Sequence, residues 1–231
     1  MLIKTVIMFL QELLPALLLL STLMVWQRQR LQPLLLSMLG ASLGGLLLLS
    51  GQFGRISQWA DGLGLELLYL SCYGLTFLLL LFSCVYSKKP KLPACLAGFA
   101  IASLLMVNGS NLLLFLFVYE QNLFSTPAVL LGATLGVGIG LSVAVLWYHL
   151  IRELSGYSLL FFRGALALLA ARQVSMAMML LVQMDWLPGG QALWNTESLL
   201  SERSEYGHFL NALLGYEASP SVAQLFGFSA G

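Results

Sequence analysis

Charged residues are scarce in this chain of 231 residues, which has 11 Lys and Arg and 10 Asp and Glu. They make up 9% of the sequence, against about a quarter in an average globular domain. Apolar residues make up 59%, and the mean hydropathy is +0.87. So little charge cannot cover the surface of a water-soluble domain. The composition therefore excludes that class and indicates an integral membrane protein.

Two further classes are excluded by what is missing. The Lys and Arg residues lie in short groups between apolar runs, so no basic patch is dense enough to bind nucleic acid. The cysteines Cys72, Cys84 and Cys95 match neither CxxC nor the ligand spacing of a zinc site. We interpret them as small packing residues. The sequence predicts neither an enzyme nor a tightly bound organic cofactor.

Apolar runs dominate what is present. A helix needs about 20 apolar residues to cross a bilayer, and runs near that length lie at 5–26, 33–50, 62–86, 93–118, 127–151 and 157–184. The sequence thus predicts an all-α integral membrane protein with six transmembrane helices. Residues 1–184 form the predicted bundle, and residues 185–231 form a tail with a short amphipathic helix.

The basic residues predict how these helices are oriented. Most of those between the runs fall in one set of alternate loops: Arg28, Arg30, Lys88, Lys89, Lys91 and Arg152. The other set has only Lys4, Arg55 and Arg203. Because basic loops stay in the cytoplasm, we expect the N-terminus outside and the tail extracytoplasmic. The tail segment "SEYGHFLNALLGY" would either lie on the membrane surface or dock a partner.

An internal repeat relates the two halves of the chain. "LLSMLGASLGGLLL" and "AVLLGATLGVGIGL" share the pattern LGA[ST]LG, unless Leu and Gly merely coincide in two apolar helices. Its glycine pairs, Gly40 with Gly44 and Gly132 with Gly136, would let helices approach closely. The copies lie three spans apart, so the halves would cross the membrane in opposite senses. This predicts an inverted 3+3 repeat, which in transporters places the binding site near the midplane.

Glu12 lies inside the first apolar run, in "FLQELLPALL". A carboxylate within the bilayer is costly and therefore a candidate functional group, although a protonated or hydrogen-bonded helix contact is the alternative. Pro15 has no N–H for the carbonyl of Gln11, which makes that oxygen a second candidate ligand. Hard cations such as Fe³⁺ prefer oxygen ligands of this kind.

Four segments carry a resemblance to a known family: "FLQELLPALL", "LFVYEQNLF", "FFRGALALLAA" and the tail "LWNTESLLSERSEYGHFLNALLGYEASPSVAQLFGF". Together they resemble the high-affinity iron permeases, the oxidase-coupled iron transporters of fungi and bacteria. In that family two REGxE motifs, in spans one and four, are taken to bind the ferric ion. By the resemblance, Gln11 stands for the first arginine, Glu12 for the first glutamate and Pro15 for the last.

The second motif is represented by Tyr119, Glu120 and Leu123 in the same three roles. The resemblance therefore implies metal ligation by Glu12 and Glu120, with iron as the transported substrate. The carbonyl of Gln11, left without a helical partner by Pro15, is the third candidate ligand. It also implies a multi-pass protein of the bacterial inner membrane, with an extracytoplasmic protein that oxidises or delivers iron as its partner. The alternative is a membrane subunit that keeps the scaffold without transporting and supports a redox or assembly complex with other subunits.

Two other polar features lie within predicted spans. Arg172 lies deep in span six, and we expect it to pair with Glu12, replacing the motif arginine lost at Gln11. Asn108 begins the sequence "NGS", which matches the glycosylation sequon but lies inside span four. We therefore assign no role to that match.

Overall fold

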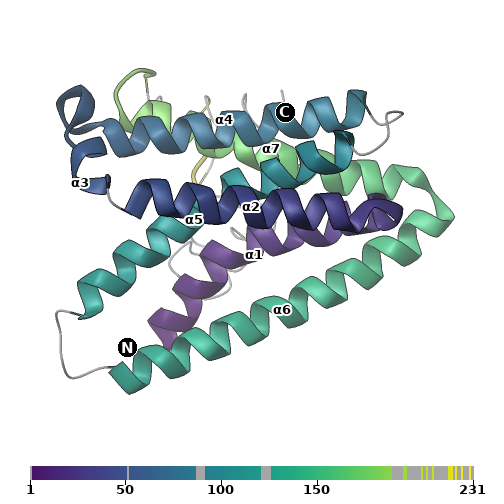
Figure 1. The fold of residues 1–231 in the computed structure, drawn as a ribbon, viewed down its shortest axis with the longest axis horizontal. Helices are drawn as coiled ribbons and strands as arrows, with labels where there is room; N and C mark the ends of the chain where they lie inside the picture. Colours follow the sequence, from purple (N-terminus) through teal and green to yellow (C-terminus); the bar gives the residue numbers. More distant parts are fainter. Residues whose placement is uncertain are drawn as a thin grey trace. The chain divides into compact units, whose positions relative to one another are not determined.

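The computed structural model describes residues 2–50, 52–86, 92–120 and 126–188, and in the tail 195–196, 204, 207, 210, 218–220, 222, 225 and 229. Within these residues the chain is helical and has no strand. The long helices are α1 (Leu2–Trp26), α2 (Leu31–Ser50), α4 (Gly64–Val85), α5 (Leu92–Glu120), α6 (Thr126–Tyr157) and α7 (Leu159–Gln183) (Figure 1). Short helices are η1 (Arg28–Arg30), α3 (Phe53–Ile56) and η2 (Trp59–Gly62).

Five of these helices are long and apolar enough to cross a membrane: α1, α4, α5, α6 and α7. They indicate a multi-pass membrane protein, as the composition predicts. The second predicted span, 33–50, corresponds to α2, whose described apolar part, Leu31–Leu47, is shorter than a full span. The number of six spans therefore stays a prediction. The predicted amphipathic helix of the tail lies almost entirely outside the described residues.

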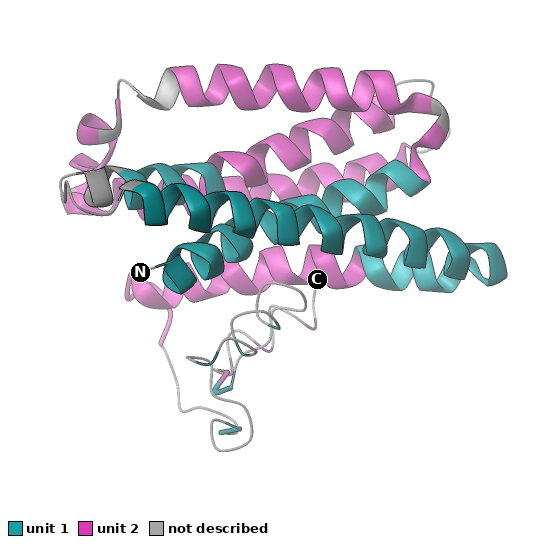
Figure 2. Cartoon of the chain, turned by 90° about the horizontal axis from the view of Figure 1, so that it is seen from below, with its two compact units in different colours: residues 1–25, 108–166, 195–219 teal, residues 26–107, 167–194, 220–231 magenta. Residues whose placement is uncertain are grey.

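The chain divides into two compact units (Figure 2). Unit 1 contains residues 1–25, 108–166 and 195–219, which are α1, the end of α5, α6 and the start of α7. Unit 2 contains residues 26–107, 167–194 and 220–231, which are α2 to α4, the start of α5 and most of α7. Each unit thus combines helices from both halves of the sequence.

In unit 1, α6 packs along α1 through its glycines. A Cβ added at Gly132 would lie 2.7 Å from the Cβ of Thr5, and one at Gly136 would lie 2.8 Å from the Cβ of Phe9. Figure 1 shows the two helices starting side by side. The numbers of the contacting residues increase together along the two helices, so α1 and α6 run parallel. The predicted close approach at this second glycine pair is confirmed.

The first glycine pair behaves differently, and its predicted close approach is not seen among the described residues. A Cβ added at Gly40 or Gly44 would meet no described atom within 4 Å. In unit 2 the contact between α2 and α5 instead uses Gly45, which faces Met106, and Gly98, which faces Ser37. The repeated pattern alone could not reveal this contact, because the residues of α2 that face α5, Ser37 and Gly45, are not its two paired glycines.

Hydrogen bonds join α4 and α5 of unit 2 as antiparallel neighbours. Ser83 Oγ donates to the carbonyl of Pro93 at 2.7 Å, and Ser103 Oγ donates to the carbonyl of Cys72 at 3.0 Å. Within the membrane such hydroxyl groups stabilise helix pairs because lipid offers no other partner. Cys72 is buried in this contact, in agreement with the packing role predicted for it.

Candidate functional site

Glu12 of α1 meets Asn111 of α5 inside unit 1. The side-chain amide of Asn111 donates to both carboxylate oxygens of Glu12, at 3.3 Å to Oε1 and 3.4 Å to Oε2. These distances are at the long end of the range for N–H···O hydrogen bonds. The amide therefore holds the two carboxylate oxygens loosely and nearly symmetrically, through a neutral donor.

Both residues lie well inside their helices. Glu12 is about 15 Å along α1 from Leu2 and about 21 Å from Trp26, at 1.5 Å per residue. Asn111 is about 14 Å from the end of α5 at Glu120. A span covers about 30 Å of hydrocarbon, so a carboxylate and an amide this far from the helix ends would lie within it. Glu12 is partly buried there. Such a carboxylate requires polar neighbours or a cation.

Asn108 adds a second amide one turn earlier on the same face of α5. Its side chain is 5% exposed, and its Nδ2 has no hydrogen-bond partner among the described residues. Burying an amide without a partner costs about 1–3 kcal/mol. Rotation of the amide by 180° would exchange its donor and its acceptor. Asn108 can therefore offer either group to a water molecule or an ion.

Gln11 and Pro15 flank Glu12 on α1. Gln11 is partly buried and makes a polar interaction, and Pro15 is buried. The helix continues through Pro15 without a break from Leu2 to Trp26. Because proline has no N–H, the turn around Glu12 lacks one helical hydrogen bond. The sequence predicted this weakened turn. The role of the Gln11 carbonyl oxygen as a metal ligand stays a prediction.

The described residues do not test whether two other predicted residues, Glu120 and Arg172, contact Glu12. Glu120 is the last residue of α5, and its side chain lies outside the described part. Arg172 is 6% exposed in α7 and belongs to unit 2, whereas Glu12 belongs to unit 1. Arg172 has a polar or charged interaction of its own. Its pairing with Glu12 therefore stays a prediction.

The described residues contain no group of three or more His, Cys, Asp or Glu side chains that could hold a metal ion. The other candidate oxygen ligands of this site belong to amide side chains, which carry no charge. Such a site would present one carboxylate together with the amide oxygens of Asn108 and Asn111. Oxygen ligands of this kind suit hard cations.

Sequence reasoning missed Asn108 and Asn111. It interpreted "NGS" as a chance match to a glycosylation sequon and passed over the asparagine that follows. A usable signal was present, because Asn108, Ser110 and Asn111 are three polar residues within one turn of a 29-residue apolar helix. Amides buried at a spacing of three residues share a helix face.

Comparison of the chain with protein-family models, with curated proteins and with solved structures finds no match.

Proposed function

We propose that this chain is an iron permease-like transporter of the bacterial inner membrane, which moves iron or a similar metal ion delivered by an extracytoplasmic partner. The observation that supports it most is the mid-helix contact between Glu12 and Asn111. A carboxylate at this depth gives no packing advantage over leucine and is expensive to keep. Binding of a cation offsets that cost.

A different placement of the second motif supports the proposal. Residues 108–111 read Asn-Gly-Ser-Asn, which keeps the glycine and the spacing of the E-G-x-E part of REGxE, with asparagine at both glutamate positions. The amide that contacts Glu12 then stands at a motif position. Glu120, nine residues beyond Asn111, becomes a candidate ligand near the outer end of α5, where a transported ion would enter.

Helix directions support the inverted 3+3 repeat with six spans. α1 runs parallel to α6 in unit 1, and α2 runs parallel to α5 in unit 2. If six successive spans cross the membrane in alternating directions, spans one and five share a direction, and so do spans two and four. Both parallel pairs agree with this. The repeat relates span one to span four and span two to span five, so the two contacts are equivalent under it.

The experiment is iron uptake into proteoliposomes that contain the purified chain. Glu12→Gln removes the charge with little change of shape, so we expect uptake to fall at least tenfold. Glu153→Gln is the matched control because Glu153 is exposed at the far end of α6. Wild-type uptake by Glu12→Gln would refute the transport role.

A scaffold subunit is the second candidate, and the replacements Gln11 and Pro15 at motif positions favour it. On this proposal no ion crosses, and the chain purifies in mild detergent with fixed partner subunits. Uptake by the purified chain alone would exclude it.

A further inference from the structure

The connection between α6 and α7 is a tight hairpin in unit 1. α6 ends at Tyr157 and α7 begins at Leu159, so one residue, Ser158, joins them. The N–H of Ser158 donates to the carbonyl of Leu154 at 3.1 Å, and its hydroxyl accepts from the N–H of Leu160 at 3.2 Å. Serine thus caps the new helix while closing the old one. These two hydrogen bonds close the hairpin, whose tip comprises residues 152–163.

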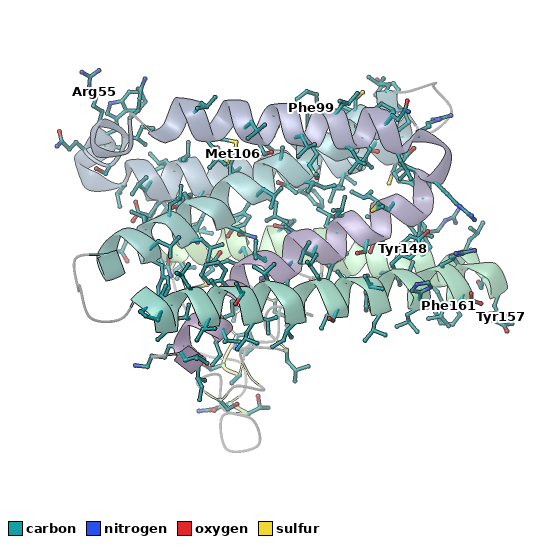
Figure 3. All side chains as sticks on the ribbon, turned by 60° about the horizontal axis from the view of Figure 1, so that its bottom comes forward. Arg55, Phe99, Met106, Tyr148, Tyr157 and Phe161 are labelled. Carbon is teal, nitrogen blue, oxygen red and sulfur yellow. The ribbon has the colours of Figure 1, made fainter. Side chains whose placement is uncertain are left out.

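Large apolar and aromatic side chains project from this tip. The exposed fraction is 86% for Tyr157, 65% for Leu159, 73% for Leu160 and 51% for Phe161. Figure 3 shows Tyr157 and Phe161 at the outer end of the hairpin, directed away from the helices. Exposure of such side chains to water is costly, at about 25 cal/mol for each Å² of apolar surface. The tip therefore lies in an environment that is partly apolar.

The depth of the hairpin tip in the membrane follows from the length of α6. α6 has 32 residues and is about 48 Å long, against about 30 Å of hydrocarbon and 40–45 Å for a whole bilayer. α6 is therefore long enough for its last turns to reach the headgroup layer while the rest of the helix crosses the hydrocarbon. Measured from Ser158, Arg152 is about 9 Å back along α6 and Arg163 about 8 Å along α7. The two arginines thus lie at the same depth, near the boundary between hydrocarbon and headgroups.

The charged side chains at this boundary favour the binding of an anion. Arg152 and Arg163 are exposed, and neither has an ion pair with another described residue. The other ionisable groups near them on the two helices are His149 and Glu153, both exposed. Two guanidinium groups against one carboxylate leave a net positive charge. The basic-loop rule predicts that this side faces the cytoplasm, where the leaflet is rich in anionic lipid.

We propose that the hairpin tip is a binding site for the headgroup of an anionic phospholipid. Arg152 and Arg163 donate to its phosphate oxygens, since guanidinium groups match phosphate geometry. Tyr157 and Phe161 insert beside the headgroup, as aromatic side chains do at membrane interfaces. The leucines of the tip cover the first carbons of the acyl chains. Both helices contribute one arginine, so the site requires the closed hairpin.

The test uses the whole purified chain in nanodiscs and native mass spectrometry with lipids of defined headgroup. Phosphatidylglycerol should remain bound in preference to phosphatidylcholine. The double variant Arg152→Gln/Arg163→Gln should lose affinity for phosphatidylglycerol by about 30-fold, the effect of two surface charges. The double Lys variant should keep most of the affinity. Arg55→Gln is the control, because Arg55 is an exposed arginine of α3 in unit 2.

Three outcomes would overturn the proposal: equal binding of both lipids by the wild type, unchanged binding by the double Gln variant, or an equal loss in Arg55→Gln. If the double Gln variant fails to fold, the wild-type preference and its loss in high salt decide, since screening weakens binding by exposed charges. Iron plays no part in these measurements, so their result is independent of the transport proposal.

Discussion

Trp147 of α6 donates a hydrogen bond from its indole Nε1 to Thr22 Oγ1 of α1 at 2.9 Å. Thr22 is fully buried, and its hydroxyl in turn donates to the carbonyl of Leu18 at 2.9 Å. One turn of α1 is thus tied to α6 by a chain of two hydrogen bonds. Nearby, Ser21 Oγ donates to the carbonyl of Ala144 at 3.1 Å. These bonds fix the register of α1, which carries Glu12.

The bond between Trp147 and Thr22 predicts a measurable coupling. Hydrogen bonds between membrane helices contribute about 0.6 kcal/mol on average and up to about 1.7. We expect a double-mutant cycle of Trp147→Phe and Thr22→Val to give a coupling of about 0.5–1.5 kcal/mol by thermal unfolding in detergent. Trp186→Phe should have little effect because Trp186 is 59% exposed. Additive effects of the two substitutions would contradict the bond.

The two copies of LGA[ST]LG provide a matched pair of variants. A Cβ at Gly136 would lie 2.8 Å from the Cβ of Phe9 and 3.0 Å from the carbonyl oxygen of Val6. Gly136→Ala should therefore lower the stability by about 1–3 kcal/mol, because α1 and α6 must separate. Gly44 holds the same place in the first copy and has no described atom in reach. Gly44→Ala should be neutral or stabilising by up to about 1 kcal/mol.

The measurement for this pair is the melting temperature of each variant in the same detergent. A shift of about 2–4 °C corresponds to 1 kcal/mol for a chain of this size. Equal shifts for the two substitutions would mean that Gly44 also has a close neighbour, or that Gly136 does not.

The sequence predicted the helices well and their contacts poorly. Hydropathy located each long helix, because a run of about 20 apolar residues has few other stable states. It also located Glu12 within α1. The partner of Glu12 could not be predicted, since a helix pattern gives the face of Asn111 but not the helix it faces. The two glycine pairs differ for the same reason: the same local pattern packs closely at Gly132 and Gly136 but has no described neighbour at Gly40 and Gly44.

The contact between Glu12 and Asn111 predicts the effect of a second carboxylate. Asn111→Asp would place two negative charges about as close as the present 3.3 Å hydrogen bond. Like charges at this distance in a partly buried site repel strongly. We expect the variant to unfold at a lower temperature than the wild type in chelator, and to gain more stability when Fe³⁺ or Mn²⁺ is added. Asn111→Leu should lose any stabilisation by metal.

Asn108→Asp serves as a comparison, since Asn108 lies one turn away on the same helix face. It should show a smaller loss in chelator because no hydrogen bond joins Asn108 to Glu12 among the described residues. If metal stabilises the wild type and Asn111→Leu equally, then Asn111 is not part of a cation site.

Gln173 of α7 carries the last prediction. Its side chain is 1% exposed, its Nε2 donates weakly to the carbonyl of Leu169 at 3.3 Å, and its Oε1 has no hydrogen-bond partner among the described residues. A buried acceptor without a donor costs about 1–3 kcal/mol, whereas an apolar side chain of similar shape does not have this cost. Gln173→Met should therefore leave the stability unchanged or raise it by up to about 2 kcal/mol. The measurement is the melting temperature in detergent, with Gln183→Met as the control because Gln183 is exposed at the end of the same helix. A loss of more than 1 kcal/mol in Gln173→Met alone would mean that Oε1 accepts a hydrogen bond from a bound water or coordinates a cation that the protein needs.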